Sequence, residues 1–327
     1  MRLRRILSSF LLVGVLLGLC GAITPLVNAQ QNDVGQGIQV SPVVIDLNGE
    51  KGQDYSLKVT VTNITAGSLV LKSSVNDFTA DGESGNPKVI LDENADNGYS
   101  LKSWVSVVPS FTLQSKESRT LTLAITIPID AEAGGHYGVI RFTGTPPDQS
   151  DANVSLNASV GVLLLTRVDG DITENLVVKQ MSAQKKGKNS GLIANGPVTI
   201  ATRVENTGNV HLKPVGTMTI KDTFGKVVGS FPFGSNSQNV LPKTTRLYTQ
   251  EFDKRWMFGR YTASVQAAYG TTGGVLQGST TFWVIPFKLI IFVIVLLAII
   301  IFGLRYLIKG HNKRVIRKAQ NSNIRKK

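Results

Sequence analysis

A predominantly apolar run of 21 residues near the carboxyl end constrains this chain more than any other feature. Residues 284–304 include one charged residue, Lys288. At about 1.5 Å of rise per residue a helix of this length extends about 31 Å, close to the thickness of about 30 Å of a bilayer's hydrocarbon core. Trp283 and Tyr306 stand at its two ends, where aromatic rings prefer the headgroup region. We therefore predict a single transmembrane helix over residues 284–304.

The residues after this run predict its orientation. Residues 305–327 contain nine lysines and arginines and no acidic residue. Positive charge next to a span is retained in the cytoplasm. We predict a basic cytoplasmic tail over residues 305–327, with the bulk of the chain on the other side of the cell membrane. Binding of nucleic acid or of a cytosolic partner by this tail is the alternative to simple retention.

The amino end has the pattern of a secretory signal peptide. Residues 1–29 combine a basic start, an apolar run over residues 10–23 and a small residue, Ala29, at the expected cleavage point. An uncleaved anchor is the alternative. The only cysteine, Cys20, lies in this segment. Cleavage would leave a mature chain without thiols, which excludes disulfides, thiolate metal sites and cysteine nucleophiles.

The net charge of +13 does not indicate a nucleic-acid-binding protein. Of the 35 basic residues, three precede position 30 and nine follow position 304, which leaves 23 against 22 acidic residues between them. The part of the chain predicted to be exported is therefore nearly neutral, and its composition gives no basic footprint for nucleic acid.

Period-two alternation recurs between residues 30 and 282, broken by Gly, Asn, Asp and Pro, and this pattern is typical of antiparallel strands in a sandwich. It predicts an all-β fold of two tandem immunoglobulin-like β-sandwich domains, over residues 37–168 and 172–283. The expected strands cover residues 38–46, 56–62, 70–78, 101–109, 118–127, 138–143 and 153–167, then 176–183, 198–205, 215–222, 226–233, 245–252, 259–268 and 277–283. The short boundary Asp169-Gly170-Asp171 predicts a stiff tandem.

One short plan occurs twice, in VTVTNITAGSLVLK (residues 59–72) and VENTGNVHLKP (residues 204–214). In each copy an alternating run stops at an asparagine, Asn63 or Asn206, turns, and resumes. Asparagine tolerates turn conformations and bonds its own backbone. We predict that each turn closes a strand pair near the start of a sandwich, and that the two copies indicate domains of related plan.

The sequence contains no convincing group of catalytic or metal-binding residues. The three histidines are His136, His211 and His311, and one histidine in each predicted domain does not make a catalytic triad or a zinc site. His136 precedes a predicted strand, and a structural role there is favoured over ligand contact. Asp92, Asn94 and Asp96 have the spacing of the first ligands of a calcium loop, but the glycine comes one place late and no closing glutamate follows, which favours a solvated acidic loop.

Three other features have a structural and a binding interpretation. Residues 80–87, ADGESGNP, lack the lysine and the helix of a phosphate loop. The cluster Lys185, Lys186 and Lys188 fits a solvated hairpin tip, with contact to wall polyanions as the alternative. Core or sandwich-edge positions are favoured over a sugar-stacking platform for Trp104, Phe111, Trp256 and Phe258. We therefore assign no catalytic, cofactor-binding or metal residues, and leave the ligand-binding residues unassigned.

The first predicted domain resembles the wall-facing domain of WxL-interacting proteins, which are surface proteins of Gram-positive bacteria. The residues that carry the resemblance are SPVVIDLNGEKGQDYSLKVTVTNIT (residues 41–65) and WVSVVPSFTLQSKESRTLTLAITIPIDAEAGGHYGVIRF (residues 104–142). The order of signal peptide, two sandwiches, one span and basic tail is also similar. The resemblance implies peptidoglycan binding by the first domain and a protein partner on the second.

These observations predict a membrane-anchored cell-surface binding or scaffold protein, without enzymatic activity or cofactor, that attaches to wall polymer and holds a surface protein. The alternative is a chaperone-like accessory subunit of an export or envelope-assembly complex. In either case a partner strand can add to an exposed sheet edge.

Overall fold

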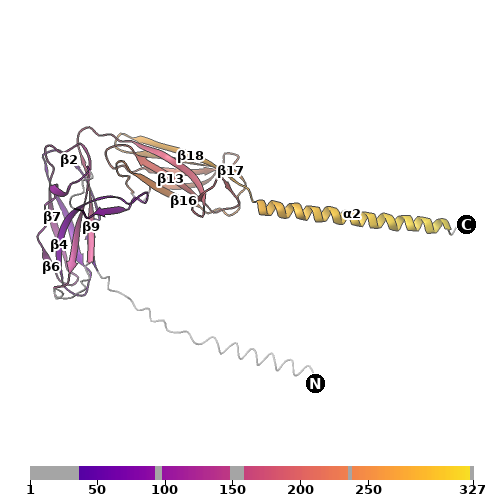
Figure 1. Cartoon of the computed structure of the whole chain (residues 1–327), viewed down its shortest axis with the longest axis horizontal. Coiled ribbons are helices and arrows are strands. Elements are labelled where there is room, and N and C mark those ends of the chain that lie inside the picture. Colours follow the sequence, from indigo (N-terminus) through magenta and orange to yellow (C-terminus); the bar gives the residue numbers. More distant parts are fainter. Residues whose placement is uncertain (1–36, 93–97, 148–157, 235–237, 325–327) are drawn as a thin grey trace, which may run out of the picture.

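The computed structural model describes residues 37–92, 98–147, 158–234 and 238–324. Its regular elements are β-strands and one short 3-10 helix, followed by one long helix at the carboxyl end (Figure 1). The chain is elongated, and the strands fall into two groups of sheets with the helix beyond the second group. The predicted signal peptide, residues 1–29, lies outside the described residues.

The first group, which we call the first sheet pair, covers residues 38–168 and contains two sheets. One has the strand order β1-β3-β7, and the other β2-β9-β8-β4-β5, with β6 also pairing with β4. The strands are β1 (Ile38–Ser41), β2 (Val44–Gly49), β3 (Asp54–Asn63), β4 (Leu69–Ala80), β5 (Pro87–Ile90), β6 (Phe111–Leu113), β7 (Ser118–Thr126), β8 (Gly134–Thr145) and β9 (Ala158–Val168).

The second sheet pair covers residues 176–284, with the strand orders β11-β10-β13-β16 and β12-β18-β17-β14-β15. Its strands are β10 (Leu176–Lys185), β11 (Lys188–Asn189), β12 (Leu192–Ile193), β13 (Val198–Asn206), β14 (Val215–Lys221), β15 (Val227–Phe233), β16 (Thr245–Phe252), β17 (Gly259–Tyr269) and β18 (Gly274–Val284).

The two sheet pairs share one pairing plan. The ladders β1-β3-β7 and β10-β13-β16 correspond, as do β9-β8-β4-β5 and β18-β17-β14-β15. Even the parallel edge recurs, because β2 pairs parallel with β9 and β12 pairs parallel with β18. Each pair also has its own hydrophobic cluster, one drawn from residues 38–168 and one from residues 176–284. Alternating burial along strands such as β7, where Leu121, Leu123 and Ile125 are buried, produces these cores.

Most predicted strands occur, but two predictions were wrong. The expected strand over residues 38–46 is two strands in different sheets, because Pro42 has no N–H group to continue the ladder. Residues 101–109 form a short 3-10 helix, Lys102–Trp104, and irregular backbone. The buried residues there are Leu101, Trp104 and Val105, a spacing that fits a helical turn and not a strand.

The repeated asparagines do not close strand pairs, so this prediction was wrong. Instead, each lies where the chain crosses from one sheet to the facing one, between β3 and β4 or between β13 and β14. Both are fully buried. The side-chain oxygen of Asn63 accepts from the N–H of Thr65, and that of Asn206 from the N–H of Gly208.

The side-chain nitrogens of these asparagines also make matching contacts. That of Asn63 donates to the carbonyls of Gly67, Leu113 and Gln114, and that of Asn206 donates to Val210 and Val240. Each amide therefore ties its own turn to the connection that enters the neighbouring strand, β7 or β16.

The helix α2 (Phe287–Ile324) follows β18 after two residues. Its segment Phe287–Tyr306 is long and apolar enough to span a membrane. Strand β18 extends to Val284, so the first residues of the predicted span, 284–286, belong to the strand and the connection, and the helix continues into the basic segment.

Replacing the buried asparagines tests their structural role. Asn206→Ala leaves two buried carbonyls and one buried N–H group without their partner. Asn63→Ala leaves three carbonyls, that of Leu113 buried, and one N–H group without their partner, so we expect each substitution to lower the free energy of unfolding by about 2–4 kcal/mol. Denaturant unfolding of the full chain in detergent measures this. Asn48→Ala, at an exposed strand position, is the control and should change little; equal stability of all three variants would contradict the role.

Candidate functional site

The two sheet pairs meet through the second copy of the repeated turn. The backbone carbonyl of Asn209 accepts from the N–H of Gly135 at 2.8 Å. The side chain of Asn209 donates to the carbonyls of Asp171 and Ala133 and accepts from the N–H of Thr173. One asparagine thus binds the first sheet pair and the connecting segment together.

His211 makes the next contact across this junction. Its Nε2 lies 3.1 Å from Oδ1 of Asp46, and its Nδ1 lies 3.3 Å from the hydroxyl of Tyr137. The rings of Tyr137 and His211 also meet edge to face. The hydrogen bond from His211 outweighs partial burial and lowers the pKa of Asp46. Burial raises the pKa of Tyr137, so this phenol stays protonated at physiological pH.

The β4–β5 hairpin, residues 81–86, reaches from the first sheet pair to the second (Figure 1). The carboxylate of Glu83 accepts from Nε of Arg203 at 2.9 Å, and its carbonyl accepts from the N–H of Leu247 at 2.8 Å. Residues 80–87, which lack the features of a phosphate loop, therefore form a bridge between the sheet pairs.

Glu174 fixes the segment that connects the sheet pairs. Its carboxylate pairs with the guanidinium of Arg167 and accepts from the N–H groups of Thr271 and Thr272. Burial opposes its ionisation, but these donors outweigh burial and lower the pKa of Glu174 to about 2. The connection is therefore bonded to both sheet pairs.

A cleft of about 430 Å³ lies between these contacts; we call it the junction cleft. Its apolar lining comes from both sheet pairs: Val44, Phe78, Leu163, Leu165 and Leu241. Its polar lining includes two cationic side chains, Lys213 and Arg246, beside Gln238 and Asn239. The cleft thus combines an apolar surface with two cationic side chains and one carboxylate, that of Asp46, which is bonded to His211.

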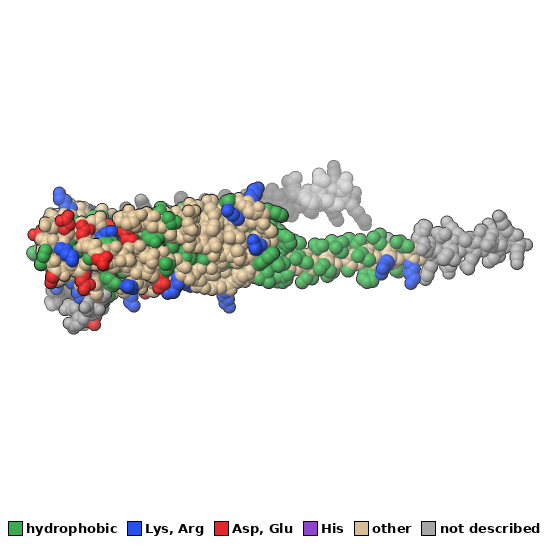
Figure 2. All heavy atoms as spheres, turned by 90° about the horizontal axis from the view of Figure 1, so that it is seen from above, with side chains coloured by type: hydrophobic (Ala, Val, Ile, Leu, Met, Phe, Trp, Pro, Cys, Tyr) green, Lys and Arg blue, Asp and Glu red, His purple; other side chains and the backbone are tan. Residues whose placement is uncertain are grey.

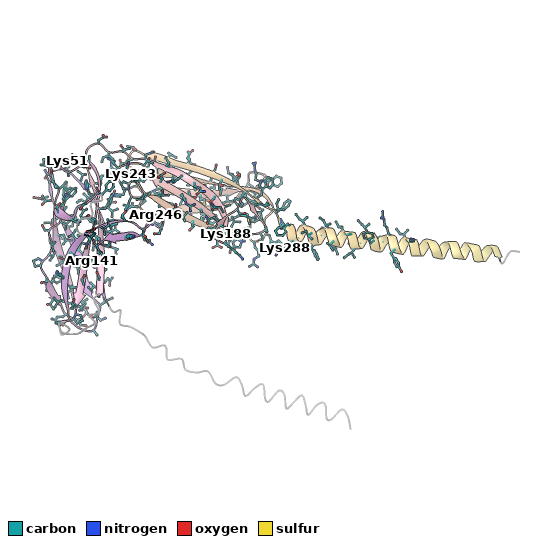
Figure 3. The ribbon with its side chains drawn as sticks, viewed as in Figure 1. Lys51, Arg141, Lys188, Lys243, Arg246 and Lys288 are labelled. Carbon is teal, nitrogen blue, oxygen red and sulfur yellow. The ribbon has the colours of Figure 1, made fainter. Side chains whose placement is uncertain are left out.

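Arg246 is the most informative residue of the junction cleft (Figure 3). Its exposed fraction is 9%, and burial lowers its pKa. One terminal nitrogen donates to the carbonyl of Asn239 at 2.7 Å. Nε is buried and has no partner among the described residues. The guanidinium lies under Gly85, where a Cβ would come within 2.5 Å of it. An arginine without a carboxylate partner carries an uncompensated charge, which an anionic ligand would neutralise.

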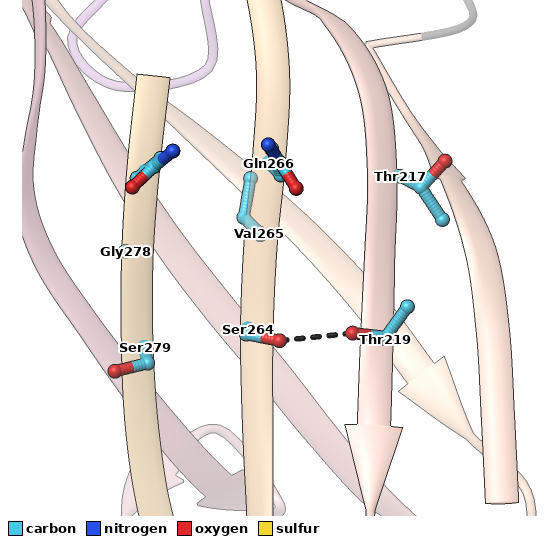
Figure 4. A pocket seen from close by; sticks show the side chains of 8 residues that line it. Thr217, Thr219, Ser264, Val265, Gln266, Gly278 and Ser279 are labelled. Atoms are coloured by element: carbon cyan, nitrogen blue, oxygen red, sulfur yellow. Dashed lines mark hydrogen bonds between the residues drawn. The ribbon is translucent and has the colours of Figure 1, made fainter. Parts of the chain in front are cut away.

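A second candidate, the polar hollow, lies on the β14-β17-β18 face of the second sheet pair, with a volume of about 550 Å³. Hydroxyl and amide side chains line it, among them Thr217, Thr219, Ser264, Gln266 and Gln277. The hydroxyls of Thr219 and Ser264 are hydrogen-bonded at 2.9 Å (Figure 4). No charged residue is among its lining residues in the described part of the chain.

His136 lies within β8, because this strand begins at Gly134, earlier than predicted. Its ring is 7% exposed, packs against Trp104 at 4.4 Å between centroids, and has its two nitrogens beside the carbonyls of Glu132 and Ser100. Asn94 and Asp96 of the predicted acidic loop lie outside the described residues. Within the described ranges, no group of three or more His, Cys, Asp or Glu side chains could hold a metal ion.

The other predicted features lie apart from the junction cleft. Lys185, Lys186 and Lys188 are in the β10–β11 hairpin, at the end of the second sheet pair nearest α2. Trp104 is buried and Phe111 is half-buried under the guanidinium of Arg119. Trp256 and Phe258 are exposed in the loop before β17. The four aromatic side chains therefore do not form one platform.

Comparisons with known proteins give structural similarity only. No family model and no curated protein matches the chain. The solved structures that resemble it include the class 5 fimbriae chaperone CfaA, with 14% identity over 76% of this chain and 100% of that chain and a TM-score of 0.38. The YadV chaperone has 14% identity, coverage of 75% and 99%, and a TM-score of 0.37.

The E. coli chaperone DraB has 15% identity, coverage of 76% and 96%, and a TM-score of 0.33. All three identities are below 25% and all three TM-scores are below 0.5, so these similarities do not indicate a function for this chain.

The ionisation of Glu174 predicts a dependence of stability on pH. Its folded-state pKa of about 2 lies below the ordinary value of 4.5, so its contribution is full above about pH 4.5 and is lost as the pH falls towards 2. Glu174→Gln should lower stability near neutral pH by about 2–4 kcal/mol, because Arg167 loses its partner, and should lose less further stability on acidification. Thermal unfolding at a series of pH values checks this, with exposed Glu50→Gln as control; parallel curves for Glu174→Gln and wild type would contradict it.

Proposed function

We propose that this chain is a membrane-anchored extracytoplasmic binding protein whose junction cleft holds a carboxylate-bearing segment of a surface protein partner. The observation that carries the proposal is the buried guanidinium of Arg246, unpaired at Nε within the described residues, beside an apolar surface. Arginine recognises carboxylates through paired hydrogen bonds. An apolar side chain next to a carboxylate, as in a peptide, matches both parts of the lining.

The proposal includes the arrangement of the chain. The repeated pairing plan and the separate hydrophobic clusters support two immunoglobulin-like domains in tandem, over residues 37–168 and 172–283. The apolar segment Phe287–Tyr306 supports a single membrane span, and the basic residues after it support a cytoplasmic tail. We propose binding without catalysis, and the packing of His136 among carbonyls and Trp104 is consistent with a structural role for this histidine.

Wall polymer is the second proposed ligand, and the polar hollow favours it. Its hydroxyl and amide groups suit the hydroxyl and acetamido groups of a polysaccharide, whereas the junction cleft suits an apolar anion. The resemblance to WxL-interacting proteins implies peptidoglycan binding on the first domain; the hollow offers a place for it on the second. A chaperone-like accessory role is the alternative use of the junction cleft, with a transient partner in place of a resident one.

The cleft can be tested by a photo-crosslinking residue at Thr79, which lines it. In intact cells we expect one discrete protein adduct, and at least about a tenfold loss of it in Arg246→Gln, since hydrogen bonds to a charged group contribute about 1.5–3 kcal/mol. Lys243→Gln, an exposed cation nearby (Figure 3), is the matched control and should keep the adduct.

An adduct of unchanged yield in Arg246→Gln, with normal unfolding of that variant, would reject the cleft as the binding site. Stable co-purification of the captured protein supports a resident partner. An adduct found only during secretion supports the chaperone-like alternative.

Wall binding is tested with the full chain in nanodiscs and isolated cell walls. We expect retention of the protein by the walls, reduced about fivefold or more in Gln266→Ala with Gln277→Ala, because each amide lost costs about 0.5–1.5 kcal/mol of hydrogen bonding. Thr281→Ala, an exposed position further along β18, is the control. Absence of retention, or retention unaffected by the double substitution, would contradict the hollow as the wall-binding site.

A further inference from the structure

The end of the second sheet pair next to α2 exposes large aromatic side chains. The exposed fractions are 93% for Phe224, 75% for Trp256, 71% for Phe258 and 48% for Trp283. These four residues, which we call the aromatic end, come from the β14–β15 turn, the β16–β17 loop and the carboxyl end of strand β18. Register places them together, because Arg260 pairs with Trp283 and its backbone bonds Thr223.

The loops of this end hold the aromatic side chains outward in fixed positions. The carboxylate of Asp222 accepts from the N–H groups of Phe224 and Lys226, and Gly225 supplies the positive φ of the turn. Between Trp256 and Phe258, the side chain of Met257 is buried in the core. The two flanking rings are therefore directed away from the core that Met257 joins.

Positive charge surrounds the same rings. Exposed lysines and arginines of this end are Lys186, Lys188, Lys226, Lys254, Arg255 and Arg260. The acidic residues in its described loops are Asp222, which is engaged in the turn, and Asp253. Figure 2 shows hydrophobic side chains and lysines or arginines where the second sheet pair meets α2, whereas acidic side chains gather at the far end of the molecule.

The position of the helix identifies what covers this surface. Only Ile285 and Pro286 separate β18 from α2, and two residues reach at most about 7 Å. When α2 spans a bilayer, the aromatic end must lie at its surface. Tryptophan prefers the headgroup region, and each lysine or arginine near anionic lipid contributes about 1 kcal/mol.

We propose that the aromatic end is a membrane-contact surface, with Trp256, Phe258 and Phe224 in the headgroup layer and the surrounding cations on anionic lipid. This inference rests on the membrane anchoring proposed above. It adds that the second sheet pair is docked on the bilayer and does not swing freely on its connection.

The test uses the full chain without Cys20, its only cysteine, in nanodiscs of phosphatidylcholine with phosphatidylglycerol. Spin labels at Arg255→Cys, Val275→Cys or Phe292→Cys report collisions with oxygen and with a water-soluble relaxing agent. Val275 is exposed at the opposite end of β18, and Phe292 is within α2. We expect the label at 255 to lose water-soluble collisions relative to 275, and to regain them when Trp256→Ser and Phe258→Ser are added.

Three other outcomes would overturn the proposal. If the labels at 255 and 275 are equally accessible while 292 is shielded, the span stands and the membrane-contact surface fails. If 292 is also accessible to the water-soluble agent, the anchoring fails. Shielding of 255 that disappears on dilution of the protein between nanodiscs assigns the surface to a second copy of the chain.

Discussion

The buried amide of Asn206 is the constraint on which the joined structure depends. It fixes the crossing between facing sheets by bonding Gly208, Val210 and Val240. The residues held this way include Asn209 and His211, which bind the first sheet pair. Asn63 makes the same kind of crossing in the first sheet pair, but there the turn meets no second group of sheets. The same buried asparagine contact thus stabilises the crossing between sheets in both sheet pairs. In the second sheet pair it also holds the turn that contacts the first.

The contacts at the junction explain why Arg246 of the junction cleft has no carboxylate partner among the described residues. Glu83 of the β4–β5 hairpin pairs with Arg203, and Gly85 of the same hairpin covers Arg246, because its missing Cβ allows the close approach. Asp46, the acidic residue of the cleft lining, is bonded to His211. Glu83 and Asp46 are therefore engaged with Arg203 and His211, and Arg246 keeps one backbone acceptor, the carbonyl of Asn239. This arrangement supports the anionic occupant proposed for the cleft.

The sequence predicts the repetitive part of this structure well. Alternation located strands such as β7 and β16 because burial there follows the pleat, and the paired asparagines indicated a repeated plan. The alternation did not reveal that Pro42 moves the chain to another sheet, whereas the spacing of Leu101, Trp104 and Val105 is a signal for a helical turn that the strand prediction overlooked. Arg246 and Glu83 belong to no recognisable sequence motif, because their roles depend on contacts with residues more than a hundred positions away in the chain. Trp256 and Phe258 are aromatic, as many core residues are, so their residue type does not reveal that their loop leaves them exposed.

With α2 in a bilayer, as proposed, the length of the second sheet pair would set the height of the junction cleft above the membrane. Strands β17 and β18 each contain 11 residues and run the length of this sheet pair, which at about 3.3 Å per residue gives about 36 Å. The junction contacts lie at one end of these strands and the aromatic end at the other. Because Glu174, Asn209 and Glu83 bond the junction at separate points, rotation between the sheet pairs would break several hydrogen bonds together. The partner segment proposed for the cleft would therefore be held at a nearly fixed distance from the bilayer.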